Sequence, residues 1–354
     1  MTVAATTAAH LAAQLLVGST ATTPEAVAGH LLAVQAQDAR GARLAIRSRT
    51  RGLTAADVDR ALTEDRSLVV SWLNRGTLHL VRSEDLAWLH GLTAPTILTA
   101  NARRLAQEGV TPDAADRGVD VIERSLTSDG PLTRADLRAR LDAAGIRTEG
   151  QALVHVLVLA SLRGLVVRGP MAGSQQAFVL VRDWLGTPPA VDRDVALAEL
   201  ARRYLVGHGP ATDRDLARWS GLGLRDARAG LRAIAGELDE AADGSVDLTG
   251  RRAVADLPPP KLLGPFDPLL LGWVSRDAIV GSHRSIITTN GIFRAFALVD
   301  GRAVGTWSLA GGRLDLAPFG HLSKATRAAL DEEADDVLRF LGAAGVAAPE
   351  EGSV

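Results

Sequence analysis

The chain has 354 residues, of which 47% are hydrophobic and 23% charged, and it carries a net charge of −2 and no cysteine. This composition is typical of a globular protein of roughly two to four domains rather than a disordered one. The lack of cysteine excludes disulfides, iron–sulfur clusters, cysteine-ligated zinc and a cysteine nucleophile, and the scattered histidines predict no metal site.

The first part of the chain predicts helices followed by a β-hairpin. The run at 69–81 has the turn residues Asn74-Arg75-Gly76 at its centre, which predicts the hairpin. Helices followed by a hairpin are the outline of a winged helix, here assigned to residues 1–115. No basic segment precedes the first helix and no apolar run reaches the roughly 18 to 20 residues that cross a bilayer, so we expect a cytoplasmic protein without membrane contact. The expected helices span residues 4–16, 24–34, 40–49 and 54–63.

Two glutamines, Gln35 and Gln37, lie between the second and third of these helices. Residues two apart point about 200° apart in a helix, whereas in an extended segment they share a face. The two amides can therefore serve one site only if the backbone leaves helical geometry before Gln37. Asp38 either caps the following helix, which we favour, or acts as a base beside the glutamines. The arginine-rich, acid-free stretch at 40–51 either faces phosphate or is an ordinary solvated helix.

A repeated motif organises the middle of the chain. GPLTRADL at 130–137 recurs as GPATDRDL at 209–216, and each copy has the Thr and Asp spacing of a capped helix start. A helix near 149–163 and the β-rich runs GLVVRG and QAFVLV follow the first copy. A helix and weaker strands near 238–249 follow the second. The pattern predicts a second winged helix over residues 116–190 and a third over residues 191–256.

Composition changes at 257–268, where LPPPKLLGPFDP holds five prolines and predicts a stiff linker. Beyond it, Asn290-Gly291 and Asp300-Gly301 predict hairpin turns, and GTWSL and RLDLAPF continue the sheet. A final helix is expected over residues 324–341. The fold class is therefore α+β: three tandem winged-helix motifs followed by a C-terminal antiparallel β-domain over residues 257–354.

The order of these motifs resembles a known family. QAQD at 35–38, RGTLHLVRSEDL at 75–86, the two GPxTxxDL helix starts, FDPLLLGW at 266–273 and LVDGRAVGTW at 298–307 are similar to the winged-helix DNA glycosylases, the group that contains YcaQ and AlkZ. The likeness covers nearly the whole chain and depends on the order and spacing of the motifs. Members divide into a Gln-x-Gln type, named for AlkZ, and a Gln-x-Asp type. Gln35-Ala36-Gln37 fits the AlkZ type, which protects bacteria that make azinomycin.

The resemblance implies a concave DNA-binding channel and an enzyme that excises bulky N7-alkylated purines, including those in interstrand crosslinks. The implied partner is double-stranded DNA carrying alkylated purines or crosslinks, bound by a monomer without a cofactor. Gln35 and Gln37 are the implied catalytic residues, with Asp38 as a secondary candidate. For each candidate DNA contact, a purely structural role is the alternative. These candidates are Arg40, Arg43, Arg75, His79, His283 and Arg284.

The chemistry of base excision is compatible with glutamines. The reaction needs a placed water and a stabilised positive sugar, for which a carboxylate is the usual tool. A glutamine amide cannot act as a base, but its oxygen accepts a hydrogen bond from water. An N7-alkylated guanine is already cationic and leaves without protonation. Two amides that hold one water can therefore suffice.

Two other functions remain open. The chain could be a non-catalytic winged-helix transcriptional regulator, although three winged helices fit a monomer that encloses DNA better than a palindromic reader. It could also sequester a drug or its adduct without catalysis. If it is a glycosylase, we expect no lyase step, because Lys261 and Lys324 are the only lysines and lie in the linker and at the last helix.

Overall fold

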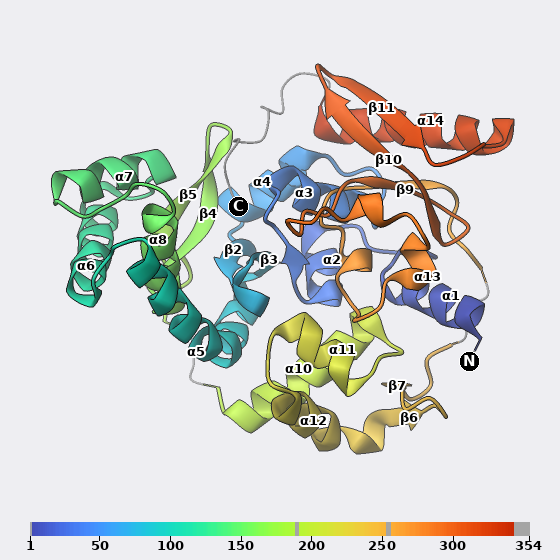
Figure 1. Ribbon diagram of the computed structural model, residues 1–354, viewed down its shortest axis with the longest axis horizontal. Helices are drawn as coiled ribbons and strands as arrows, with labels where there is room; N and C mark the ends of the chain where they lie inside the picture. Colours follow the sequence, from blue (N-terminus) through green and yellow to red (C-terminus); the bar gives the residue numbers. More distant parts are fainter. Residues whose placement is uncertain (1, 188–190, 253–255, 343–354) are drawn as a thin grey trace. The chain divides into compact units, whose positions relative to one another are not determined.

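The computed structural model describes residues 2–187, 191–252 and 256–342, which form two compact units (Figure 1). Unit 1 comprises 1–58, 197–219 and 223–354, and unit 2 comprises 59–196 and 220–222. These units follow spatial contacts, whereas the four segments predicted above follow sequence motifs. The number of winged helices therefore stays a prediction, and the last residues of the predicted C-terminal segment, 343–354, lie outside the described residues.

The N-terminal part of unit 1 is helical, as predicted. Thr2, Thr23 and Asp38 each begin a helix by accepting a bond from a backbone N–H of its first turn. The predicted helices are confirmed within a few residues of their expected bounds. The elements are α1 (Val3–Ala13), α2 (Pro24–Leu31), β1 (Val34–Gln35), α3 (Ala39–Arg47) and α4 (Ala55–Thr63), which continues into unit 2.

Unit 2 contains two hairpins joined into one sheet. Its strands lie in the order β3-β2-β4-β5, because Val70 of β2 pairs with Arg168 of β4. Both predicted hairpins are confirmed. Thr133 and Asp136 make the predicted capping box at the start of α7. The elements are β2 (Leu68–Trp72), β3 (Leu78–Arg82), α5 (Ser83–Gln107), α6 (Pro112–Asp129), α7 (Arg134–Ala143), α8 (Ala152–Leu162), β4 (Val166–Ala172), β5 (Gln175–Leu180) and α9 (Val181–Trp184).

The second copy of the repeated motif also begins a helix. Asp215 accepts bonds from the backbone N–H and hydroxyl of Thr212, at 2.9 and 2.7 Å, which confirms the expected cap. The predicted short strands near 238–249 are confirmed as an antiparallel pair. The elements are α10 (Arg193–His208), α11 (Asp213–Ser220), α12 (Leu224–Ala233), β6 (Leu238–Glu240) and β7 (Val246–Leu248).

The C-terminal part of unit 1 is an antiparallel sheet in the order β11-β10-β9-β8, and α14 packs against β8 and α3 (Figure 1). The final helix and the turn at Asp300-Gly301 are confirmed. None of the described helices combines the length and apolar composition that a membrane-spanning segment needs. The elements are β8 (Lys261–Leu263), α13 (Asp277–Val280), β9 (Phe296–Val299), β10 (Arg302–Ala310), β11 (Arg313–Pro318) and α14 (Lys324–Leu341).

Two details of this sheet differ from the prediction. The proline-rich segment is not only a linker, because its residues 261–263 form β8 and pair with β9. The turn at Asn290-Gly291 is flanked by a single bridge between Ile287 and Phe293 rather than by two strands. Strand β9 pairs with β8 and with β10, so the residues before the turn add no strand to this sheet.

Candidate active site

The segment that carries the two glutamines is not helical. Helix α2 stops at Leu31 because Leu32 has a φ of 65° and a ψ of −44°, outside helical geometry. Gln35 ends the short strand β1, and Gln37 lies in the bend before α3. The prediction that the backbone leaves helical geometry before Gln37 is confirmed. Gln35 is 7% exposed, whereas Gln37 is open to solvent.

Asp38 has the geometry of a helix cap. Its φ and ψ of −104° and 113° are extended, and its Oδ1 accepts a 2.6 Å bond from the backbone N–H of Gly41. This confirms the capping interpretation, because an N-cap side chain satisfies a first-turn donor that has no intrahelical partner. A second, catalytic role for Asp38 stays a prediction.

The first turn of α3 packs directly against the proline-rich segment. A Cβ on Gly41 would lie 2.4 Å from the carbonyl oxygen of Pro265, and a Cβ on Gly264 would lie 2.8 Å from Cβ of Leu44. Both distances are shorter than any ordinary carbon contact, so only glycine fits at either position. The helix that follows the glutamines is therefore held by residues more than two hundred positions away.

A fully buried ion pair fixes the other end of α3. The Arg49 guanidinium donates to both carboxylate oxygens of Asp267, at 2.8 and 2.9 Å, and neither side chain is exposed. Arg49 also donates to the backbone oxygens of Gln14 and Ala45 and to the side-chain oxygen of Gln14. These bonds join α3 to the end of α1 and to the segment after β8.

The arginine-rich stretch is not simply a solvated face. Arg47 is 4% exposed and pairs with Glu333 and Asp336 of α14, each at 2.8 Å. Arg43 is 9% exposed and donates to the carbonyl of Ala39 at 2.8 Å. Arg40 is half-buried. DNA contacts by Arg40 and Arg43 stay predictions, and Arg47 and Arg49 have structural roles.

Two candidate DNA contacts lie in the β2–β3 hairpin of unit 2. Arg75 has a φ of 58° at the turn and is half-buried. His79 is 2% exposed, and one ring nitrogen, Nδ1, lies 2.9 Å from the carbonyl of Thr77. Burial lowers the pKa of His79 to about 3, so at neutral pH it offers a phosphate no positive charge. Its DNA contact stays a prediction that the geometry does not favour.

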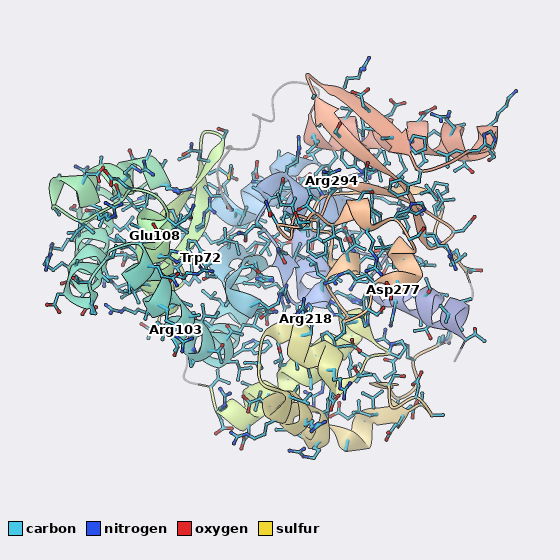
Figure 2. The ribbon with its side chains drawn as sticks, in the orientation of Figure 1. Trp72, Arg103, Glu108, Arg218, Asp277 and Arg294 are labelled. Carbon is cyan, nitrogen blue, oxygen red and sulfur yellow. The ribbon has the colours of Figure 1, made fainter. Side chains whose placement is uncertain are left out.

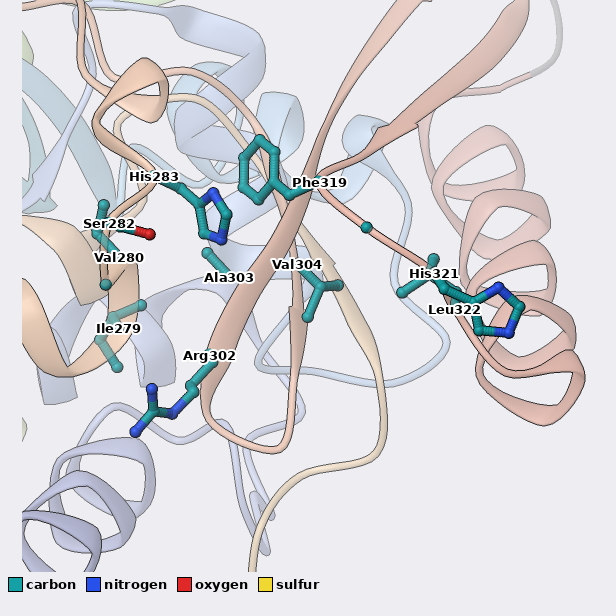
Figure 3. A pocket seen from close by; sticks show the side chains of 12 residues that line it. Ile279, Val280, Ser282, His283, Arg302, Ala303, Val304, Phe319, His321 and Leu322 are labelled. Carbon is teal, nitrogen blue, oxygen red and sulfur yellow. The ribbon is translucent and has the colours of Figure 1, made fainter.

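The remaining candidates, His283 and Arg284, lie between α13 and the Asn290-Gly291 turn. The His283 ring stacks on Phe319, with centroids 4.1 Å apart and planes 14° apart (Figure 3). Arg284 is largely exposed and lies 3.5 Å from Asp277. Their DNA contacts are likewise untested.

Two further arginines, Arg218 and Arg276, lie in unit 1 but were not predicted from the sequence as site residues. Arg276 donates from Nε to the carbonyl of Leu270 at 2.6 Å, and its guanidinium lies 5.2 Å from the ring centre of Phe293. Burial, and then the charge of Arg218, lowers the pKa of Arg276. Arg218 makes no ion pair within the part of the chain that the structure describes, and Figure 2 labels it in unit 1. Two arginines this far apart in sequence give no local signal.

Metal chemistry has no candidate in the described ranges. No group of three or more His, Cys, Asp or Glu side chains there is arranged to hold an ion. The expectation that the protein uses neither a metal nor a cofactor stays a prediction.

Comparisons with known proteins agree with one another. The sequence profile of the family described as DNA glycosylase AlkZ-like matches residues 28–340, which include Gln35 and Gln37. The chain is similar to an interstrand DNA cross-link repair glycosylase from Streptomyces sahachiroi, with 31% identity over 343 residues that cover 89% of this chain and 90% of that protein. Among solved structures it is similar to the Streptomyces sahachiroi DNA glycosylase AlkZ, with a TM-score of 0.78, 28% identity and 96% of each chain covered.

Proposed function

Because the chain belongs to the AlkZ-like DNA glycosylase family, we propose that it hydrolyses the N-glycosidic bond of bulky N7-alkylated purines and unhooks azinomycin-type interstrand crosslinks. The observation that carries this proposal is the non-helical Gln35-Ala36-Gln37 segment between α2 and α3. The similar Streptomyces protein is named for interstrand crosslink repair, which supports this substrate class. The protein would act as a monomer on double-stranded DNA and protect its host against such damage.

In the proposed reaction, the amide oxygens of Gln35 and Gln37 accept hydrogen bonds from one water and aim its lone pair at C1′ of the sugar. The C1′–N9 bond breaks and its electron pair neutralises the cationic purine. The water oxygen bonds to C1′, and its proton passes to solvent. The two amide dipoles also face the positive charge that develops on the sugar. No general acid is needed, since the leaving purine is already charged.

The surroundings of α3 support this role because they limit movement of the glutamine segment. The Asp38 cap and the contact between Gly41 and Pro265 hold the beginning of the helix, and the Arg49–Asp267 pair holds its end. Rigid support matters, because a displacement of about 1 Å can cost a hundredfold in rate.

Phosphate contact in unit 1 is better supported for Arg276 and Arg218 than for Arg43. The charge of Arg218 lowers the pKa of Arg276, and a phosphate bound by both guanidinium groups would offset this unfavourable interaction. Arg40 remains a third candidate, since it makes no ion pair in the described residues.

We propose no lyase step, and Lys261 is the residue on which this expectation can be tested. Burial lowers the pKa of Lys261, and a lysine with a lowered pKa is a better nucleophile. Borohydride treatment during turnover should trap no covalent complex. A complex that forms with wild type and not with Lys261→Arg would refute the monofunctional mechanism.

The experiment that tests the function measures free modified base released from a duplex with a single N7-alkylguanine, under single-turnover conditions. We expect release by wild type and by Gln107→Ala, a surface glutamine on α5. A crosslinked duplex should in addition separate into single strands on a denaturing gel. Tight DNA binding without release would instead indicate a regulator, and binding of free drug without release a sequestering protein.

A further inference from the structure

A cavity of about 360 Å³ lies in the C-terminal part of unit 1, and one of the candidate DNA contacts, His283, lines it (Figure 3). It is lined by residues 279–283, 302–304 and 319–322. Its volume is at the lower end of the range of small-molecule sites, which is about 300 to 1,000 Å³. A single nucleotide is a ligand of the corresponding size.

The cavity is lined by basic side chains and by no acidic ones among the described residues. The basic side chains are Arg302, His283 and His321. These three side chains make no ion pair or side-chain hydrogen bond within the described part of the chain. Arg47 and Arg49 in the same unit are saturated with partners, whereas the basic side chains of the cavity are available to an anion.

Much of the remaining lining is apolar. Ile279, Val280 and Ala303 are at most 7% exposed and form the floor. The stacked rings of His283 and Phe319 form one wall, and Arg302 lies at one end of the cavity, as Figure 3 shows. An aromatic wall beside a cation is the combination by which proteins hold a base and its phosphate.

We propose that this cavity binds one nucleotide, with its base against the Phe319–His283 wall and its phosphate at Arg302. The choice of a nucleotide rests on the proposed function, because a protein that acts on DNA meets this chemistry on every substrate. The nucleotide can come from a DNA strand or from free mononucleotide, and both sources supply the same two groups. The site would hold DNA at a second point, apart from Gln35 and Gln37.

The test is a titration of the full chain with thymidine monophosphate and with thymidine, followed by amide NMR shifts at residues 281–283, 302–304 and 319–322. Arg302→Gln should raise the Kd for the monophosphate about tenfold and leave the Kd for thymidine unchanged, since about 1.4 kcal/mol of phosphate contact is lost. Phe319→Leu keeps an apolar side chain but removes the ring, and it should raise both Kd values about tenfold.

Arg313→Gln is the matched control, because Arg313 is an exposed arginine of the same sheet that pairs with Asp315. It should change neither Kd. Equal effects of Arg302→Gln and Arg313→Gln, or no shifts at the lining residues, would overturn the proposal.

A short oligothymidylate separates the two sources. If the oligothymidylate binds at least tenfold tighter than the monophosphate and shifts the same resonances, the ligand is a DNA strand. If the gain in affinity is less than tenfold, the ligand is the free nucleotide. Base release distinguishes this inference from the proposed function. Release of N7-alkylguanine by wild type, with no nucleotide binding in the cavity, would overturn only this inference. Nucleotide binding in the cavity by a protein that releases no base would contradict only the proposed function.

Discussion

Substituting Asp267 by asparagine removes the carboxylate that neutralises Arg49 in the interior of unit 1. Both side chains are fully buried, and the guanidinium donates to both carboxylate oxygens, at 2.8 and 2.9 Å. Removing one partner of a buried pair costs about 3 to 5 kcal/mol, because the other charge stays in a medium that cannot solvate it. Asparagine keeps the shape and one oxygen acceptor, so we expect a loss of about 3 kcal/mol.

Urea unfolding followed by circular dichroism measures this loss. The matched control is Asp315→Asn, which breaks the Arg313–Asp315 pair, whose side chains are 81% and 54% exposed. A surface pair contributes about 0 to 1 kcal/mol, so the control should unfold close to wild type. Hydrogen–deuterium exchange should also rise in α3 of Asp267→Asn and not in the control. Equal unfolding midpoints for the two variants would refute the stabilising role assigned to the buried Arg49–Asp267 pair.

Three further substitutions test the Asp38 cap, the buried histidines and the cationic residue Arg276. Asp38→Ala should destabilise the protein by about 1 kcal/mol in urea, whereas Asp38→Asn retains the cap and should keep both stability and base release; loss of release in a stable Asp38→Asn would show that the carboxylate acts in catalysis. Burial lowers the pKa of His208 to about 3 and of His10 to about 4, so the unfolded chain binds protons that the folded protein does not. Stability is then complete above about pH 6.5 and falls toward pH 4, by about 2 kcal/mol per histidine at pH 5. In thermal melts at pH 7.5 and 5, His208→Gln should show less of this loss, and the exposed control His321→Gln should show all of it. Arg276→Gln should reduce the slope of log affinity for DNA against log salt by about 1, and an unchanged slope would exclude a phosphate contact.

Features set by neighbouring residues could be predicted from the sequence. Thr133 and Asp136 form the capping box that their spacing predicts, and the turn at Asn74-Arg75-Gly76 joins two strands as expected. The non-helical state of Gln37 could also be predicted, because a shared site for two glutamines at positions i and i+2 requires it. Local backbone chemistry decides each of these features.

Features set by distant residues could not be predicted. Arg49 and Asp267 are 218 positions apart, so the sequence offered only a phosphate-facing or a solvated role for the arginine-rich stretch. The packing of Gly41 against Pro265 is equally invisible in a single sequence, although a glycine in the first turn of a helix is a weak sign of close contact. The same holds for β8, because its pairing with β9 depends on how the chain returns across more than thirty residues.

The roles of the candidate residues were less predictable than their surroundings. His79 lies in a family-like motif, yet its burial leaves it neutral. Arg218 and Arg276 lie in no motif, yet they are brought close enough for one charge to lower the pKa of the other. Charge alone in a sequence does not say whether an arginine is neutralised, and only the fold places its partners.

The most direct test of the central claim is the single-turnover rate of N7-alkylguanine release by Gln35→Ala and by Gln37→Ala, each compared with Gln107→Ala at saturating enzyme. If both amides hold the attacking water, each catalytic variant should lose at least about tenfold in rate, which is the worth of about 1.4 kcal/mol of lost hydrogen bonding, while DNA affinity and unfolding midpoint stay those of the control. Rates within about threefold of wild type for either variant would contradict the account.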